Sequence, residues 1–162
     1  MKIWRRIRSL NLYQLSKFSI LFARHPSLII PTLRATKETF IVCNKRYKEG
    51  HGKSNKGNAF RHALWNTLIC VNSLKNTGNI EKSAVWAQKT TDLYEKVTQN
   101  SKIDEQMDLH NNAMGRRLFI DFSNNDKAKI IDIVFEKSTE AIKIKSVEDL
   151  DNVKSKMVYI ID

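Results

Sequence analysis

The sequence predicts an all-α fold, a helical bundle of five or six helices with a small β appendage at the C-terminus. Apolar residues recur at helical spacing along most of the chain, and Pro, Gly and Asn separate these stretches. With 162 residues, 41% of them hydrophobic, the chain is long enough for one domain with a buried core. We expect residues 1–162 to form a single domain: basic N-terminal helices at 1–56, a helical core at 57–145 and an appendage at 146–162.

The N-terminal segment is predicted to form two basic amphipathic helices. Apolar residues follow helical spacing from Trp4 to Phe22, and Pro26 and Pro31 mark a break before a second helix that runs to about Lys48. Residues 1–56 hold thirteen Lys and Arg against two acidic residues, whereas residues 57–162 hold fifteen of each sign. This segment is typical of an in-plane anchor at an anionic membrane surface. The alternative is that its helices pack on the bundle and present a basic face to solvent.

The next predicted helix contains the segment Asn58–Asn66, which reads NAFRHALWN. On a helical wheel its apolar arc has Arg61 within it and His62 at its border. Asn58, His62 and Asn66 are spaced by four, so their side chains share one edge of the helix. Because an unpaired buried charge costs several kcal/mol, these groups are expected to find partners or a ligand.

Two further helices are expected to complete a polar cluster. Residues 81–97 form a narrow face of small side chains that ends at Glu95, with Asp92 nearby. Residues 107–116 read MDLHNNAMGR, in which Asp108, Asn112 and Gly115 lie along the margin of the apolar side. The sequence predicts an ion pair between Arg61 and Asp108, and it predicts a cluster of four side chains, namely His62, Glu95, Asp108 and Asn112.

The C-terminal part is predicted to contain one more helix and two short strands. The helix spans residues 126–141, and alternation at 141–145 and a β-branched run at 157–161 indicate strands on either side of a helical turn at 147–153. Plausible helix N-caps are Asn79, Ser101 and Asn125.

The motifs in these three helices resemble those of a bacterial domain family of unknown function, found as short stand-alone proteins in Bacteroidetes-type bacteria and as a module of larger proteins. The motifs are NAFRHALWN at 58–66, TDLYE at 91–95 and MDLHNNAMGR at 107–116, and the resemblance covers roughly residues 1–145. It implies an all-helical fold and these site positions, and no established activity. The family commonly has His-Glu at the end of the second motif, where this chain has Tyr94-Glu95.

The residue types favour a metal-independent acid-base site. His62 is the expected general acid or base, oriented by Asp108 or Glu95, with Arg61 stabilising negative charge on a substrate. These four are the candidate catalytic residues, and the candidate substrate-binding residues are Asn58, Asn66, Asp92, Asn111 and Asn112. The alternative is that these side chains only tie the helices together as a satisfied buried network.

Metal binding and cysteine chemistry are not favoured by the sequence. The conceivable ligands are His62, Glu95, Asp108 and His110, but Asp108 and His110 are two residues apart on a helix and point to nearly opposite sides. We therefore expect no metal and no cofactor. The two cysteines, at 43 and 70, lack an activating pattern and suit a reducing compartment.

Together these patterns predict a hydrolase that acts on a membrane or envelope component. The expected ligand is an unidentified small molecule, lipid or glycan, and the expected location is cytoplasmic with peripheral attachment to the inner membrane. The first alternative is a non-enzymatic binding or interaction module associated with a toxin or the envelope. Nucleic acid is disfavoured as a partner, because the aromatic residues follow the apolar stripe and no nucleic-acid motif accompanies the charge.

Overall fold

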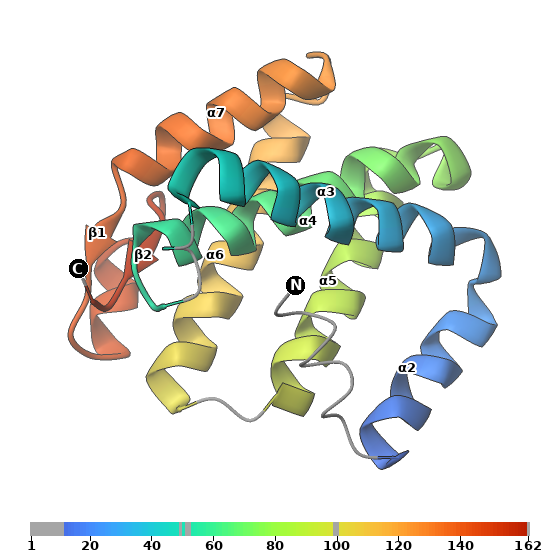
Figure 1. The fold of residues 1–162 in the computed structure, drawn as a ribbon, viewed down its shortest axis with the longest axis horizontal. Coiled ribbons are helices and arrows are strands. Elements are labelled where there is room, and N and C mark those ends of the chain that lie inside the picture. Colours follow the sequence, from blue (N-terminus) through green and yellow to red (C-terminus); the bar gives the residue numbers. More distant parts are fainter. Residues whose placement is uncertain (1–11, 49, 51–52, 99–100, 162) are drawn as a thin grey trace.

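A computed structural model describes residues 12–48, 50, 53–98 and 101–161, and it confirms the all-α prediction (Figure 1). Within these residues, six α-helices precede two short strands. The helices are α2 (Leu12–Arg24), α3 (Ile29–Tyr47), α4 (Lys56–Thr77), α5 (Ile80–Thr98), α6 (Lys102–Asp121) and α7 (Lys127–Thr139). The predicted helical residues before position 12, including Trp4, lie outside the described part of the chain.

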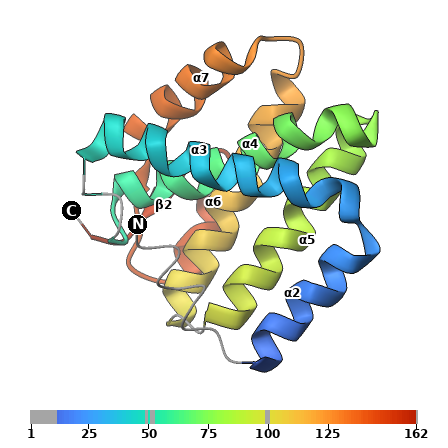
Figure 2. The same ribbon diagram turned by 45° about the vertical axis from the view of Figure 1, so that its right-hand side comes forward.

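Helix α4 lies at the centre of the bundle, where it contacts α3, α5, α6 and α7. In Figures 1 and 2, α3 runs beside α4, and α5 and α6 lie side by side and extend away from them. Because neighbours surround α4, its buried residues include the apolar Phe60 and Leu64 and also the polar His62 and Asn66. The central position of α4 therefore explains why its polar edge is inside the molecule.

Local sequence signals set most of the helix ends. The Asn55 side chain caps α4 by accepting a hydrogen bond from the Asn58 N–H at 3.2 Å. Helix α4 ends at Gly78, whose φ of 64° is the left-handed conformation that glycine adopts at little cost. The predicted caps Asn79 and Ser101 are confirmed, because their side chains accept hydrogen bonds from the N–H groups three residues later.

Two predicted boundaries differ from the structure by a few residues. The cap of α7 is Asp126 and not Asn125, because the Asp126 carboxylate accepts from Lys129 N–H at 2.8 Å. Asn125 instead donates to the Phe122 carbonyl. Pro26 begins a 3-10 turn, η1 (Pro26–Leu28), as expected of a break, but Pro31 lies in the first turn of α3. A proline is tolerated there because an N–H in the first turn has no partner within the helix.

The apolar side of α4 faces α3 and α7 through an aromatic cluster. Tyr47, Phe60 and Phe135 come from α3, α4 and α7, and their ring centroids lie 5.6 to 5.7 Å apart. Phe60 is fully buried at the centre of this cluster. Aromatic pairs at such separations add to the stabilisation from burial, so this cluster fixes α4 against its outer neighbours.

Helices α4 and α6 approach each other unusually closely at Gly115. A Cβ atom added to Gly115 would lie 2.0 Å from the Ala63 carbonyl oxygen, which is a backbone atom that cannot turn aside. Thr67, one turn further along α4, donates to the Gly115 carbonyl at 2.9 Å. The missing side chain at Gly115 therefore permits the approach that brings the polar edges of α4 and α6 together.

The C-terminal appendage forms as predicted. Strands β1 (Ile142–Lys143) and β2 (Val158–Tyr159) pair in parallel, with Ile142 opposite Val158, and the 3-10 helix η3 (Glu148–Asn152) lies between them in the chain. Asn111 of α6 holds β2, since its amide donates to Val158 O at 2.8 Å and accepts from Val158 N at 2.9 Å. The appendage is thus attached directly to the motif-bearing helix α6.

Candidate functional site

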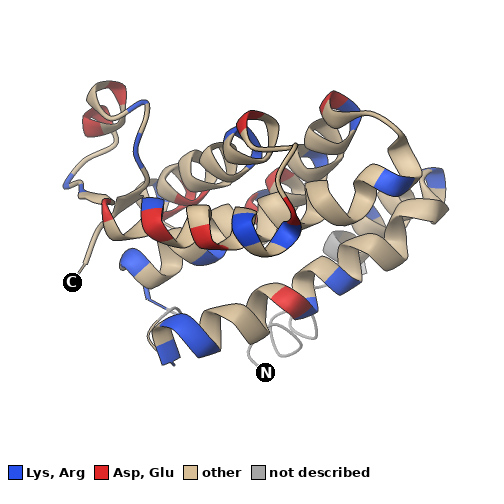
Figure 3. Cartoon of the chain, turned by 90° about the horizontal axis from the view of Figure 1, so that it is seen from above, with Lys and Arg blue, Asp and Glu red and all other residues tan. Residues whose placement is uncertain are grey.

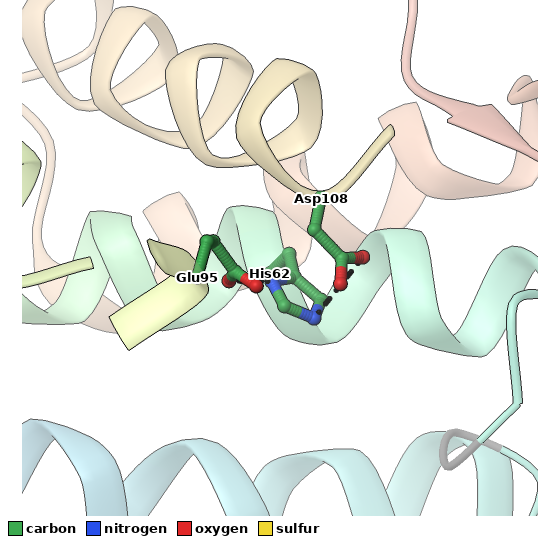
Figure 4. A group of neighbouring side chains, drawn as sticks. All are labelled: His62, Glu95 and Asp108. Carbon is green, nitrogen blue, oxygen red and sulfur yellow. Dashed lines mark ion pairs between the residues drawn. The ribbon is translucent and has the colours of Figure 1, made fainter. Parts of the chain in front are cut away.

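The structure brings His62, Glu95 and Asp108 together from three helices (Figure 4). His62 Nδ1 lies 3.3 Å from Glu95 Oε1, and His62 Nε2 lies 3.3 Å from Asp108 Oδ1. All three residues are at most 5% exposed. One imidazole from α4 is therefore held between a carboxylate from α5 and a carboxylate from α6, as the spacing of the three motifs predicted.

His62 Nε2 has two polar neighbours of opposite character. Arg61 Nη2, from the same helix, lies 2.8 Å from Nε2, and Asp108 Oδ1, from α6, lies 3.3 Å from it. A guanidinium donates hydrogen bonds and a carboxylate accepts them. Arg61 can therefore pair with Nε2 when this nitrogen is unprotonated, and Asp108 can pair with it when it is protonated. Arg61 also donates to the Asn58 side chain and is only half-buried, which links the buried cluster to the molecular surface.

A network of amides supports the Nδ1 side of the ring. Asn112 Oδ1 lies 3.2 Å from His62 Nδ1, and Asn112 Nδ2 donates to Glu95 Oε1 at 3.4 Å. Asn66 donates to Asn112 Oδ1 at 2.7 Å. The side-chain oxygen Oδ1 of Asn66 in turn accepts from Thr91 and from Arg116. Through these bonds, Asn66 of α4 and Asn112 of α6 together fix the orientation of the imidazole and of the Glu95 carboxylate.

Asp108 is held by more than His62. Asn58 Nδ2 donates to Asp108 Oδ1 at 2.8 Å. Burial raises the pKa of the Asp108 carboxyl, and the nearby Glu95 raises it further, whereas His62, Arg61 and the Asn58 hydrogen bond lower it. The predicted pairing of Arg61 with Asp108 is thus replaced by direct contacts from His62 and Asn58, while Arg61 acts on Asp108 through its charge.

One oxygen of the cluster has no partner. Glu95 Oε2 is fully buried and has no hydrogen-bond partner among the described residues, although the Oε1 atom of the same carboxylate contacts His62 and Asn112. Buried carboxylate oxygens are almost always paired, because leaving water without a new partner costs free energy. An unpaired oxygen beside a histidine is therefore an unusual feature of this site.

Two candidate residues lie outside the cluster. Asn111 uses both atoms of its amide on the Val158 backbone, so it positions the appendage. Asp92 is half-buried near Arg116, where it raises the pKa of that guanidinium against the larger lowering caused by burial. His110 is also separate, since its Nε2 contacts the Lys156 carbonyl at 2.8 Å. The seven other candidates all belong to one connected network, namely Asn58, Arg61, His62, Asn66, Glu95, Asp108 and Asn112.

Residues 19–142 match the family model described as Domain of unknown function (DUF6973). The chain belongs to this family. The match includes every candidate site residue and excludes the strand β2. No curated protein and no solved structure matches the chain.

Two residues of the network, Thr91 and Arg116, were not among the candidates from the sequence. Arg116 donates to Asn66 Oδ1 at 2.9 Å, which connects the far end of the 107–116 motif to α4. The available signal was its spacing, because Arg116 is four residues after Asn112 and therefore lies on the same edge of α6. Tyr94 packs edge-to-face on Trp65 with ring centroids 5.1 Å apart.

Proposed function

We propose that this chain is a hydrolase in which His62 is the acid-base residue and needs no metal ion for proton transfer. The observation that supports this most is the position of Nε2 between Arg61 Nη2 at 2.8 Å and Asp108 Oδ1 at 3.3 Å. Unprotonated Nε2 accepts a hydrogen bond from Arg61, and protonated Nε2 donates one to Asp108. Because each protonation state has a partner, this nitrogen is suited to take a proton and return it.

The neighbouring residues have distinct roles in this proposal. Glu95 and Asp108 contact opposite edges of the imidazole and orient it, as carboxylates do for catalytic histidines. Arg61 is half-buried next to the ring, and it would stabilise negative charge that develops on a substrate oxygen. Asn58, Asn66 and Asn112 hold these groups in place. We assign Asn111 no role in the reaction, because its amide already holds β2 through two hydrogen bonds.

The proposed substrate is a phosphoester, glycan or lipid component of the membrane or envelope. Supporting this, residues 12–48 hold seven Lys and Arg against one acidic residue. Lysine and arginine recur along α3 (Figure 3). Its outer surface also exposes Ile30, Leu33 and Ile41, each at least 48% accessible. Mixed apolar and basic faces favour binding in the plane of an anionic surface. No helix within the described residues is both long and apolar enough to cross a bilayer.

The second candidate function is a non-enzymatic binding or interaction module. The burial of His62, Glu95 and Asp108 favours it, because a network with at most 5% exposure can also serve only to fix the helices. The two candidates differ in what His62 does, and hydrolytic activity separates them.

The direct experiment compares His62→Asn with His110→Asn. Purified protein is incubated with bacterial envelope fractions, phospholipid vesicles and glycan polymers, and release of phosphate, fatty acid or reducing sugar is measured. His110 is the matched control because its ring nitrogen contacts only a backbone carbonyl on the far side of α6 among the described contacts. We expect His62→Asn to lower release by about 100-fold or more and His110→Asn to leave it unchanged. Equal release from both variants would contradict the proposed role of His62.

The membrane part of the proposal has its own experiment. Leu33→Asp places a charge on the outer face of α3, and Val85→Asp does the same on α5, at a residue with the same 48% exposure. In flotation with vesicles that contain anionic lipid, we expect Leu33→Asp to lose binding and Val85→Asp to retain it. Binding that is indifferent to both Leu33→Asp and lipid charge would contradict attachment through α3.

A further inference from the structure

The three side chains at the centre of the site also have the composition of a metal-ion centre. One potential ligand atom from each of His62, Glu95 and Asp108 lies within 4.8 Å of the other two. Ligands about 2.1 Å from one tetrahedral Zn²⁺ are about 3.4 Å apart. Asp108 already contacts His62 Nε2, so for an ion on Nε2 the Glu95 carboxylate, which contacts Nδ1, has to turn toward that side of the ring. The sequence named these three residues and His110 as conceivable ligands; the structure brings the three together and leaves His110 apart, at the Lys156 carbonyl.

The unpaired Glu95 Oε2 is an independent observation that indicates a ligand. Glu95 is 2% exposed, and this oxygen makes no hydrogen bond although its neighbours are polar. A cation bound by the Glu95 carboxylate would supply the partner that its second oxygen, Oε2, lacks among the surrounding protein groups. The described protein contacts therefore explain one oxygen of Glu95 and leave the other to be explained.

The groups behind the three ligands are those that support metal ligands. Asn112 Oδ1 lies beside His62 Nδ1, and Asn58 Nδ2 donates to Asp108. In metal sites the second nitrogen of a ligating histidine and the second positions of ligating carboxylates are held by such partners. Arg61 Nη2 lies 2.8 Å from Nε2, so the proposal requires this half-buried side chain to move away from Nε2 when an ion binds there.

We propose that His62, Glu95 and Asp108 form a binding site for one divalent transition-metal ion, with Zn²⁺ the best fit. One imidazole nitrogen and two carboxylates suit zinc and manganese, whereas calcium and magnesium prefer oxygen ligands alone. This inference does not rest on the proposed hydrolysis. An ion on the nitrogen that exchanges protons would occupy its lone pair, so zinc would inhibit the metal-independent reaction.

The experiment measures binding of Zn²⁺ to the full chain after dialysis against a chelator. Isothermal titration gives stoichiometry and affinity, and the thermal midpoint is recorded with and without Zn²⁺, since an ion bound only by the folded state raises it. Glu95→Gln keeps the size of the side chain and removes the ligand charge. Glu81→Gln is the matched control, because Glu81 is an exposed glutamate on the same helix.

We expect one Zn²⁺ per chain, about 100-fold or more weaker binding in Glu95→Gln, and unchanged binding in Glu81→Gln. Asp108→Asn is expected to weaken binding as well, and Arg61→Gln to strengthen it by removing a neighbouring positive charge. Absence of Zn²⁺ binding by the unmodified chain, or equal binding by Glu95→Gln and Glu81→Gln, would overturn the proposal. Because no substrate is present, neither result decides whether His62 catalyses hydrolysis.

Discussion

The two sides of α4 differ in what they bury. Toward α3 and α7, Phe60 packs between Tyr47 and Phe135, and burying such a side chain stabilises the fold by about 1.5 to 3 kcal/mol. Toward α5 and α6, the same helix buries His62 and Asn66 among carboxylates and amides. Buried ion pairs roughly break even against the cost of removing them from water. One side of α4 therefore contributes most to stability, and the other carries the polar cluster on which the proposed function depends.

The largest expected effect is on the apolar side. Phe60→Ala removes the ring at the centre of the aromatic cluster and should lower the free energy of unfolding by about 3 to 5 kcal/mol. Chemical denaturation measures this change. Ile41→Ala is the control, because Ile41 is 59% exposed and its truncation should change stability by no more than about 0.5 kcal/mol. Similar values for the two variants would remove the basis of the comparison.

The next effect concerns the spacing between α4 and α6. Gly115→Ala places a methyl group 2.0 Å from the Ala63 carbonyl oxygen, so the helices must separate, at a cost of about 3 kcal/mol. Separation also pulls Asp108 and Asn112 away from His62, so hydrolytic activity should fall together with stability. In the control Gly50→Ala, the added Cβ meets nothing within 4 Å, and stability should be nearly unchanged. A Gly115→Ala variant as stable as Gly50→Ala would show that the close approach is not required.

A smaller change in stability is expected on the polar side. Asp108→Asn keeps the shape of the side chain and removes one of two neighbouring buried carboxylates, so the free energy of unfolding should change by only about 1 to 2 kcal/mol. Hydrolytic activity should nevertheless fall by about 100-fold, because His62 loses the negative charge that stabilises its protonated state. Asp121→Asn, on an exposed part of α6, is the control for both measurements. Full activity in Asp108→Asn would exclude the orienting role of Asp108.

The smallest effect is chemical and concerns the thiols of the apolar interior. Burial raises the pKa of both Cys43 and Cys70 to about 12. At pH 8 only about one thiol in ten thousand would then be ionised, and the thiolate is the reactive form. We expect thiol reagents to modify neither cysteine in the folded chain and both in urea. Because these pKa values exceed the ordinary thiol value of 9.0, the folded state should lose stability as the pH rises above 9. Rapid modification at pH 8 without denaturant would contradict the burial of the thiols.

The sequence predicted the helices, the paired strands and the main cluster because their signals are local. Spacing by four placed Asn58, His62 and Asn66 on one edge, and the small face of α5 placed Glu95 near them. The β-branched run at 157–161 and the alternation at 141–145 predicted β1 and β2, which pair as expected. Such patterns follow from the geometry of one element, so they can be recognised before the elements are assembled.

Contacts between elements were not predictable in the same way. Asn111 was expected to serve a substrate, but a strand that lies 47 residues later in the chain takes both of its hydrogen bonds. The partner of Asp108 was expected to be Arg61, whereas the crossing of α4 and α6 at Gly115 brings His62 and Asn58 to it. Helix spacing shows which side chains share an edge, and only helix packing decides which edges meet.

The most direct test of whether the two sides of α4 have different roles uses the variants Phe60→Leu and His62→Asn. For each variant, the activity per folded molecule is compared with the free energy of unfolding. Phe60→Leu should lower stability and retain activity, because it changes only the side of α4 that faces α3 and α7. His62→Asn should lose about 100-fold or more of the activity at a smaller cost in stability. If His62→Asn keeps its activity, or if activity in both variants falls only in proportion to stability, the polar cluster is a structural network and not an active site.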